Sequence, residues 1–543
     1  MSTKEVRFAV MIDSTFLKKW QIECIQKLVA IKDVQLNCFF INDDVEKNFN
    51  IKSSIGYRFL ERSIRNKGAL EVQAISNYFP VSKIIPLKPE KDRFYTVLNQ
   101  QDLEIIKSHN LDFILRFGFG ILKRDVLTVP KYGIWSFHHA DHELIRGGPT
   151  GFWDIHLNHH TNGAMLQRLT NQLDAGIILK SGLIKTSKHS FKENVNRILM
   201  LSTDWPAQVV KQYLLNKNTQ DFPIHPIQKK ATLYKTPNNL QVLSFLSILI
   251  LNKLKFHWNE LFIAEFWNIG VAKQEISTFS NQQVGEIDWA PQPPKGKYRA
   301  DPFANSKDSE SILYESFNYK TFKGEIHQIK YHGNNWSKSE IVLQSENHLS
   351  YPYCIKEDEK VYLLPESHES GKLILKCLSD GTENKLLSGA WLDPTLIKYQ
   401  SKWWLFCSHK KAPNEQLYLF FAEQIEGPYI AHTLNPVITD VRNARPAGTP
   451  FIKNGKLYRP AQNCLNTYGG SIRIQELIVL TETNYEEQTV NELFPNLRSD
   501  YPSGIHTIAS FGNYTLIDGK KHQFSLTNLV TSSKRKLNRL LKR

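Results

Sequence analysis

The sequence predicts an α/β domain built on an open parallel sheet, followed by an all-β five-bladed propeller. Up to about residue 215, apolar strand-like runs alternate with amphipathic helical runs, which is the pattern of a parallel sheet with crossover helices. From about residue 260, short strands with turn signals replace that pattern, and a loose repeat recurs five times. A chain of 543 residues has room for both.

The first half contains the elements that define the sheet. Function in such sheets lies at the carboxyl ends of the strands, so the segment 136–148 is of most interest. We expect strands at 6–12, 34–41, 111–120 and 133–139, an amphipathic helix at 15–31 and a helical segment at 122–129.

Each repeat of the second half is an apolar strand, a polar turn and a second, aromatic-rich strand. Five copies with this spacing predict five propeller blades. The copies are "ADPFANSKDSESILYES", "YPYCIKEDEKVYLLPES", "LDPTLIKYQSKWWLFCS", "AGTPFIKNGKLYRPAQN" and "IHTIASFGNYTLIDG". The predicted organisation is an α/β domain at 1–215, a helical connector at 216–259, the propeller at 260–525 and a basic tail at 526–543.

The formal net charge of +15 comes from scattered lysines, with one dense basic run, "SSKRKLNRLLKR", at the end. That run predicts a solvated helix or a weak contact with an anionic membrane surface, and no specific nucleic-acid binding. The six dispersed cysteines, without a CxxC pair, predict a reduced, cytoplasmic protein. The apolar run "VLSFLSILIL" at 242–251 is too short to cross a bilayer, so we expect a buried helix, with membrane-surface contact as the alternative.

The segment "SFHHADHELIRGG", residues 136–148, is rich in histidine and follows a predicted strand. It contains no HExxH motif and no cysteine partner, so no metal site is expected. His139 and His142 are interpreted as solvated side chains. His138 is the exception, because its surroundings carry a family resemblance.

The stretch "DFILRFGFGILKRDVLTVPKYGIWSFHHADHELIRGGPTGFWDI" resembles the folate-dependent formyltransferases, which have a Rossmann-like fold. The resemblance places His138 on the family histidine, Arg146 and Gly147 on the Arg-Gly pair, and Asp174 on the catalytic aspartate. It implies 10-formyltetrahydrofolate as cofactor. The backbone of Phe117, Gly118, Phe119, Gly120 and Ile121 would line the folate pocket.

Formyl transfer to an amine needs a group that takes up a proton and donors that stabilise an oxyanion. A histidine oriented by a carboxylate meets the first need, and the family's asparagine meets the second. This chain has Ser136 at the asparagine position, and a hydroxyl donates only one hydrogen bond. Three hypotheses follow: an active formyltransferase site, a related one-carbon or acyl reaction, or a degenerate domain.

The second half resembles the propeller at the N-terminus of glucosamine inositolphosphorylceramide transferases and, more distantly, five-bladed propeller glycosidases. On the glycosidase pattern, Asp301 and Asp393 take two of the three acidic positions, but Arg445 stands where the general acid is expected. Glu366 is a candidate substitute. Alternatively, Asp301, Glu366, Asp393, Arg445 and His506 line a polar, sugar-binding axial pocket, or they only tie the blades together.

The leading hypothesis is therefore a cytoplasmic transferase of glycan biosynthesis. Its first domain would transfer a formyl or related one-carbon unit to an amino sugar or sugar nucleotide, and its propeller would bind the carbohydrate partner. The alternatives are a glycan-binding or scaffolding protein with a degenerate formyltransferase domain, and a propeller glycosidase or glycosyltransferase component. The acceptor and the oligomeric state are not indicated by the sequence.

Overall fold

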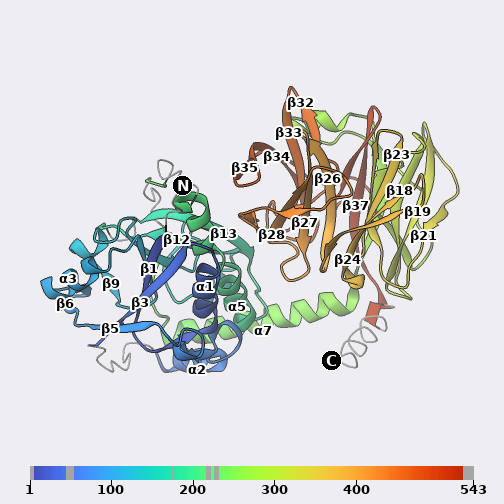
Figure 1. The fold of residues 1–543 in the computed structure, drawn as a ribbon. Coiled ribbons are helices and arrows are strands. Elements are labelled where there is room, and N and C mark those ends of the chain that lie inside the picture. The colour runs from blue at the N-terminus through green and yellow to red at the C-terminus, as the bar shows by residue number, and fades with distance from the viewer. Residues whose placement is uncertain are drawn as a thin grey trace. The chain divides into compact units, whose positions relative to one another are not determined.

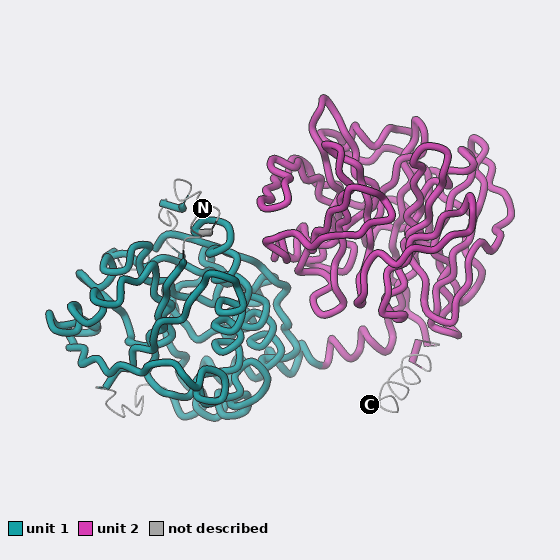
Figure 2. Tube along the Cα trace, in the orientation of Figure 1, with its two compact units in different colours: residues 1–253 teal, residues 254–543 magenta. Residues whose placement is uncertain are grey.

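The computed structural model describes residues 5–43, 54–172, 176–215, 222–224, 231–526 and 528–529. The chain forms two compact units, residues 1–253 and 254–543, coloured separately in Figure 2. Two predicted features, Asp174 and the basic run at 532–543, lie outside the described residues. The four-part division predicted from the sequence stays a prediction.

Unit 1 is built on a seven-stranded sheet in the order β13-β12-β10-β8-β1-β3-β5 (Figure 1). The five strands from β10 to β5 are parallel, as predicted, whereas β12 runs antiparallel to β10, and β13 runs antiparallel to β12. The strands are β1 (Val6–Ile12), β3 (Val34–Asn42), β5 (Lys83–Leu87), β8 (Phe113–Arg116), β10 (Ile134–His138), β12 (Thr161–Arg168) and β13 (Ile177–Lys185).

The alternation of side chains along β1 explains the layered core of unit 1. Phe8 and Val10 face one core, which includes residues of α1, α5 and α6, while Ala9 and Met11 face a second core that includes residues of α3. Both faces of the sheet are therefore covered, as in doubly wound α/β domains. The helices are α1 (Lys19–Val29), α2 (Ile55–Ile64), α3 (Gln100–Ser108), α4 (Phe152–His156), α5 (Phe191–Leu201), α6 (Trp205–Val209) and α7 (Asn239–Phe262).

The shorter elements of unit 1 complete the connections. The helix predicted at 122–129 is a single 3₁₀ turn, Arg124–Leu127, after the two-residue strand β9 (Ile121–Leu122). Five other short elements are 3₁₀ turns at Gly68–Leu70 and Ile75–Asn77, strands β6 (Glu90–Asp92) and β7 (Tyr95–Val97), and a π-helical turn at Val210–Leu215. Two small pairings join β2 (Phe16–Lys18) to β4 (Val72–Ala74) and β11 (Ile145–Gly147) to β14 (Thr232–Tyr234).

Helix α7 starts in unit 1 and ends in unit 2, and it differs from the buried helix that we expected at 242–251. Val242 and Phe245 pack into the core of unit 1. Leu243, Ile250 and Leu251 are 61%, 58% and 65% exposed. The expectation of burial was wrong because only one narrow side of the helix meets a protein core.

In its described residues, unit 2 consists of five antiparallel sheets, each made of consecutive strands except the first. Strands β21, β30 and β32 are side branches within three of them. The first sheet joins the two ends of the unit, since β15 pairs with β37 along ten residues (Figure 1). Its strands are β15 (Ile263–Ala272), β16 (Ile287–Trp289), β36 (Ile508–Phe511) and β37 (Tyr514–Phe524).

The other four sheets follow in chain order. The second has β17 (Lys297–Ala304), β18 (Ser311–Asn318), β19 (Lys323–His332), β20 (Asn335–Trp336) and β21 (Glu340–Leu343). The third has β22 (Ser350–Glu357), β23 (Lys360–Glu366), β24 (Lys372–Cys377) and β25 (Glu383–Ser388). The fourth has β26 (Trp391–Tyr399), β27 (Lys402–His409), β28 (Gln416–Ala422), β29 (Ile430–Ala431) and β30 (Ile438–Thr439). The fifth has β31 (Arg445–Pro446), β32 (Phe451–Lys453), β33 (Lys456–Asn463), β34 (Ser471–Leu480) and β35 (Tyr485–Leu493), and 3₁₀ turns lie at Ile276–Ser280 and His368–Ser370.

A bulge recurs in the first strand of the second, third and fourth sheets. Asp301, Tyr351 and Asp393 each precede a proline, adopt a positive φ of 46° to 52°, and interrupt the strand register. A non-glycine residue in this conformation is strained, and such strain is concentrated where side chains must be aimed at a site. The repeat predicted from the sequence is therefore a structural repeat as well.

Candidate functional site

A cavity of about 250 Å³ opens at the carboxyl ends of β8 and β10 in unit 1. This is the edge of the sheet at which the sequence predicted a site. Its wall includes the predicted residues Ser136, His138, Gly147 and Ile121. The other lining residues are Tyr95, Arg116, Leu122, Lys123, Phe137, Gln167, Leu169, Thr170, Asn171, Gln172 and Gly176.

His138 is the last residue of β10, and its ring lies in the cavity wall. Its Nε2 is 3.2 Å from the backbone oxygen of Ile145. A carbonyl oxygen only accepts hydrogen bonds, so this contact favours the tautomer with the proton on Nε2. Nδ1 is then the nitrogen that can take up a proton.

Ser136 lies two residues before His138 and is buried. Its Oγ accepts hydrogen bonds from Nε of Arg116 at 3.2 Å and from Nη2 of Arg116 at 3.0 Å. Because both contacts use the oxygen as acceptor, the hydroxyl proton of Ser136 can still be donated. A neighbouring guanidinium polarises that hydroxyl, which makes it a better donor.

Arg116 is a functional candidate that the sequence analysis missed. It is the last residue of β8, and its Nη1 also donates to the backbone oxygens of Gly118, at 3.2 Å, and Gly120. Burial lowers its pKa, with Asp13 acting in the opposite direction, but a guanidinium remains charged at neutral pH. The sequence did contain a feature that could have identified Arg116, because this residue begins the stretch "RFGFGIL" at the end of a predicted strand.

The five residues predicted to line a folate pocket divide into two groups. Ile121 lies in the cavity wall, whereas Phe117 packs against Phe137 and Trp20, and Phe119 is buried in the second core. Gly118 has no room for a side chain, since a Cβ there would lie 2.6 Å from the backbone nitrogen of Asp13.

Gly120 has a positive φ of 58°, and its carbonyl faces Arg116. The turn formed by residues 117–120 therefore fixes Arg116 beside Ser136, and these four residues are not among those that line the cavity.

Arg146 and Gly147 belong to the short strand β11, which pairs with β14. Gly147 lies in the cavity wall, and a Cβ there would approach the backbone oxygen of Tyr234 to 2.2 Å, so only glycine fits. Arg146 is half-buried and is not among the residues that line this cavity. The predicted third catalytic residue, Asp174, lies outside the described residues.

His139 differs from the solvated side chain that we expected. Its ring packs edge-on against Trp20 and stacks on Phe137, and its Nε2 lies 3.2 Å from Oγ of Ser202. Burial, with smaller contributions from His138 and Lys18, lowers the pKa of His139 to about 3. His139 is thus a neutral residue of the core beside the cavity.

In unit 2 a second polar cluster contains all five predicted axial residues. Asp301 lies 3.3 Å from Nε2 of His506, and Nδ1 of His506 lies 2.6 Å from Asp518. Burial alone would lower the pKa of His506, but Asp518 and Asp301 together raise it. These three side chains are also close enough to hold a metal ion. Asp301 also accepts hydrogen bonds from the hydroxyl of Thr507 and the backbone nitrogen of Tyr351, and these bonds hold its carboxylate in place without a metal ion.

The other half of this cluster is centred on Asp393. Nε of Arg445 lies 2.5 Å from Oδ2 of Asp393, and Nε2 of Gln462 donates to the same oxygen at 3.0 Å. The backbone nitrogen of Asp393 donates to Glu366 at 3.1 Å. Burial raises the pKa values of Asp301 and Asp393, although His506 and Arg445 respectively oppose the shift.

Glu315 is a buried acid of this cluster that the sequence analysis missed. Burial, followed by the charges of Asp301, Glu366, Asp393 and Asp518, raises its pKa well above the usual value. In the strand register Glu315 lies opposite Ala300, just as Glu366 lies opposite Ser350. Aligning "LYES" with "LLPES" in the repeat would have identified it.

Comparison with known proteins finds different relatives for the two halves of the chain. Residues 272–499 match the family described as "Glucosamine inositolphosphorylceramide transferase 1, N-terminal". Glucosamine inositolphosphorylceramide transferase 1 of Oryza sativa subsp. japonica is 32% identical over 206 residues, which cover 35% of this chain and 28% of the rice protein. Methionyl-tRNA formyltransferase of Prochlorococcus marinus strain SARG is 30% identical over 121 residues, 21% of this chain and 35% of that enzyme.

Solved structures with low overall similarity include a family 117 glycoside hydrolase of Zobellia galactanivorans, at 14% identity and a TM-score of 0.31, covering 46% of this chain and 80% of that one. Another is phosphoribosylglycinamide formyltransferase of Anaplasma phagocytophilum, at 14% identity and a TM-score of 0.29, covering 43% of this chain and 100% of that one. The chain spans less than half of the length of the curated relatives it matches. Both predicted resemblances are confirmed: the first half of the chain is formyltransferase-like, and the second half is similar to the N-terminal region of glucosamine inositolphosphorylceramide transferase 1.

Proposed function

We propose that the chain is a formyltransferase, or a related one-carbon transferase, that acts on the amine of an amino sugar or sugar nucleotide in glycan biosynthesis. One observation carries this proposal: His138 and the hydrogen-bonded pair of Ser136 and Arg116 lie in the wall of one cavity. A group that accepts a proton thus lies beside donors suited to an oxyanion, which is what acyl transfer to an amine requires.

The residues around the cavity fit a folate at its reacting end. Arg116, Gln167 and Asn171 supply polar groups, and Ile121, Leu122 and Leu169 supply apolar surface. A volume of about 250 Å³ is slightly below the 300–1,000 Å³ typical of whole small-molecule sites. The cavity would therefore hold part of 10-formyltetrahydrofolate, and we propose that this part bears the formyl group.

10-Formyltetrahydrofolate, when bound, supplies the formyl carbon that the acceptor amine attacks. Nδ1 of His138 would take the proton that leaves the amine, because Nε2 keeps its own proton against the Ile145 carbonyl. The bond between the formyl carbon and the folate nitrogen must then break, and His138 would return its proton to that nitrogen as tetrahydrofolate leaves. The hydroxyl of Ser136 would donate to the oxygen that becomes negative, and Arg116 would stabilise that charge through the same hydroxyl. Asp174 is predicted, from the resemblance alone, to orient His138.

For unit 2 we propose a five-bladed propeller that binds the carbohydrate partner near its axis. Pairing of β15 and β16 with β36 and β37 supports closure of a ring, as does the bridge between Gly448 of the fifth sheet and Ile508 of the first. The cluster draws on strands of all five sheets, which supports a position near a common axis. In sheet order the contributing residues are Asp518, Asp301, Glu366, Asp393 and Arg445.

The cluster favours binding over glycoside hydrolysis. Asp393 is held by Arg445 and Gln462, and Asp301 is held by Thr507, His506 and the backbone of Tyr351. A carboxylate with its oxygens engaged in this way is a poor base for activating water. A binding or scaffolding protein with a degenerate formyltransferase domain is the remaining alternative.

A formyl-transfer assay with 10-formyltetrahydrofolate and a panel of nucleotide-linked amino sugars tests the proposal, with the products identified by mass. His138→Ala and Asp174→Asn should each abolish most activity, and the double variant should be little worse, because groups acting as a unit are non-additive. His142→Ala is the matched control, since His142 is half-buried but does not line the cavity. Full activity in the double variant would refute the proposed site.

Folate binding is tested separately from turnover. The stable analogue 5-formyltetrahydrofolate should raise the melting temperature, because a ligand that binds only the native state stabilises it. No shift at millimolar analogue, together with no transfer to any acceptor, would favour the degenerate domain.

Binding of tRNA, the substrate for which the methionyl-tRNA formyltransferase relatives are named, is tested directly. We expect tRNA binding to be weak and to disappear as salt is raised, since it would depend on the net charge of +15 alone. Tight binding at physiological salt would exclude the amino-sugar proposal. The six free cysteines support the proposed cytoplasmic location, where thiols stay reduced.

A further inference from the structure

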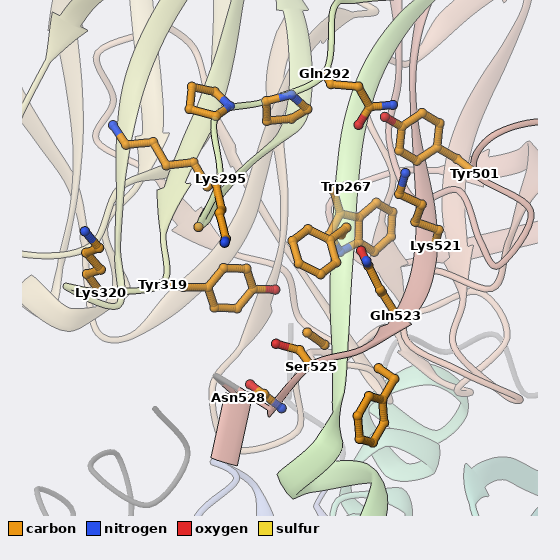
Figure 3. A pocket seen from close by; sticks show the side chains of 17 residues that line it. Trp267, Gln292, Lys295, Tyr319, Lys320, Tyr501, Lys521, Gln523, Ser525 and Asn528 are labelled. Carbon is orange, nitrogen blue, oxygen red and sulfur yellow. The ribbon is translucent and has the colours of Figure 1, made fainter. Parts of the chain in front are cut away.

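Unit 2 contains a cavity of about 650 Å³ that the proposed transfer reaction does not use. It lies between the first residues of β15, the end of β37, the loop at 292–297 and the turn after β18, as Figure 3 shows. Its volume is in the usual range for small-molecule sites. The ring of Trp267 forms part of the wall, and its centroid is 4.1 Å from that of His506.

The charge of the cavity is one-sided. Four lysines line it, Lys295, Lys297, Lys320 and Lys521, and no acidic residue does. None of the four forms an ion pair within the part of the chain that the structure describes, whereas Lys520 next to them is held by Glu265. Lys521 lies over the ring of Tyr501, with its Nζ 5.0 Å from the centroid. Four ammonium groups around one cavity make a site for an anion.

The loop that carries two of these lysines is stiff. It reads "APQPPKGK", and its three prolines restrict the backbone before Lys295 and Lys297. The backbone nitrogen of Lys297 donates to Pro294 at 3.0 Å, and the guanidinium of Arg299 donates to the carbonyl of Pro291. Little conformational freedom remains to be lost when a ligand binds.

The exposed apolar side of α7 leads to this cavity. Leu243, Leu246, Ile250, Leu254 and Trp258 recur every three or four residues, and all are exposed. At the end of the helix, the ring of Phe262 stacks on Phe524 of the cavity wall. Asn528, another lining residue, donates to the carbonyls of Glu260 and Ile263.

The charge around α7 points to one kind of surface. From residue 222 to residue 259 the sequence contains five lysines and no aspartate or glutamate. The helix is long and apolar enough to cross a membrane by length and composition. Because Val242 and Phe245 are buried in the core of unit 1, lipid cannot surround the helix. An exposed apolar stripe with flanking lysines is suited to lying in an anionic lipid interface.

We propose that this cavity binds the phosphorylated headgroup of a membrane lipid, while the exposed stripe of α7 lies in the adjoining interface. The lysines would contact the phosphate, and Trp267, Tyr319 and Phe524 would contact the apolar part of the headgroup region. The site is independent of the formyl-transfer site in unit 1 and holds whether or not that reaction takes place.

Sedimentation of the full-length protein with vesicles tests this assignment. Vesicles of phosphatidylcholine with a minor share of phosphatidic acid should bind the protein, and phosphatidylcholine alone should not. Lys295→Ala, Lys320→Ala and Lys521→Ala together should weaken vesicle binding by about a hundredfold. Each lysine near an anionic surface contributes roughly a factor of five to the affinity, and the three factors multiply. The matched control replaces Lys338, Lys372 and Lys385, which are exposed, form no ion pair with the described residues and lie away from the cavity lining.

A second pair of variants tests the helix. Leu254→Gln with Trp258→Gln should weaken vesicle binding, whereas Ile341→Gln with Leu497→Gln, at equally exposed apolar positions, should not. Equal losses in the two lysine triples would mean that net charge alone drives binding and would overturn the site. Thermal stabilisation by inorganic phosphate without any vesicle binding would overturn the lipid assignment. Retained binding in the helix variant would overturn the role of α7.

Discussion

The hydroxyl of Ser136 and the guanidinium of Arg116 form a two-point contact, with Oγ 3.2 Å from Nε and 3.0 Å from Nη2. The formyltransferase resemblance has an asparagine where this chain has Ser136. A serine supported by a cation can supply the same donor, so the departure from the family pattern has a local compensation.

Arg116→Met therefore tests whether Ser136 acts through the guanidinium. We expect formyl transfer to fall by about 10²–10³ in kcat, the usual cost of losing an oxyanion donor, with a small change in KM. Ser136→Asn should be tolerated, because the amide restores a donor at the same place. If Arg116→Met changed only KM, the guanidinium would be binding substrate rather than stabilising the transition state.

Asp154 in α4 provides a pH-dependent test of unit 1. It is buried, its Oδ1 has no hydrogen-bond partner among the described residues, and burial, with a contribution from Asp141, raises its pKa to about 7. The folded state holds this proton more tightly than the unfolded state, so the group's contribution to stability is lost as pH rises from about 4 to about 7.

Asp154→Asn removes that dependence. The variant should melt higher than the wild type at pH 8, by a free energy of up to about 4 kcal/mol, because a shift of about three pKa units corresponds to that amount. At pH 4 the two proteins should melt together. Thermal melting at both pH values measures the difference in melting temperature between the variant and the wild type. The same difference at pH 4 and at pH 8 would contradict a raised pKa for Asp154.

The ion pair of Arg459 and Glu487 in the fifth sheet tests the packing of unit 2. Each side chain is 1% exposed, and Nη2 lies 2.8 Å from Oε1. Arg459→Met should destabilise unit 2 by about 3–5 kcal/mol, because it leaves a buried carboxylate without its partner. Adding Glu487→Leu should recover most of the loss, which urea unfolding followed by tryptophan fluorescence would measure. A double variant no more stable than the single one would refute this explanation.

Glu315 and Glu366 occupy equivalent positions, yet their surroundings differ. Glu366 accepts from the backbone of Asp393 at 3.1 Å and lies 2.7 Å from Nδ1 of His368. Oε1 of Glu315 has no hydrogen-bond partner in the described part of the chain, and Nε2 of His348 lies 3.6 Å from it. Glu366→Gln should therefore cost about 1–3 kcal/mol of stability at neutral pH.

Glu315→Gln should cost less than Glu366→Gln at the same pH, because burial raises the pKa of Glu315 and so favours its neutral form. Parallel thermal melts of the two variants at pH 7 compare them. Equal destabilisation by both would show that Glu315 is ionised in the folded protein.

Sequence patterns predicted the layers of both units because burial imposes a period on the chain. The strand at 6–12 was recognisable because all but one of its side chains are buried. The five repeats were recognisable because each places a strand with apolar side chains in a core. The site residues Ser136 and His138 were found from one motif, and the structure places both in one cavity.

The remaining features depend on contacts between distant positions. Arg116 acquires its role only when the turn at 117–120 folds it onto Ser136, and His139 is half-buried because Trp20 and Phe137 pack against its ring. The exposure of α7 could not be read from its composition, because an apolar helix that covers a core and one that faces lipid have the same residues.

The first sheet of unit 2 pairs residues 263–272 with residues 515–524. The ribosome therefore makes one of these two strands near the beginning of the unit and the other near its end. Until β37 has left the ribosome, the edge of β15 that pairs with β37 along ten residues is open to other chains. Unit 1 can finish folding during that interval, because domains fold as they emerge. A chain that ended just before residue 514 would lack β37, the strand that joins β15 to β36 in this sheet. The strand left without its partner would then be β15, at the opposite end of the unit's sequence.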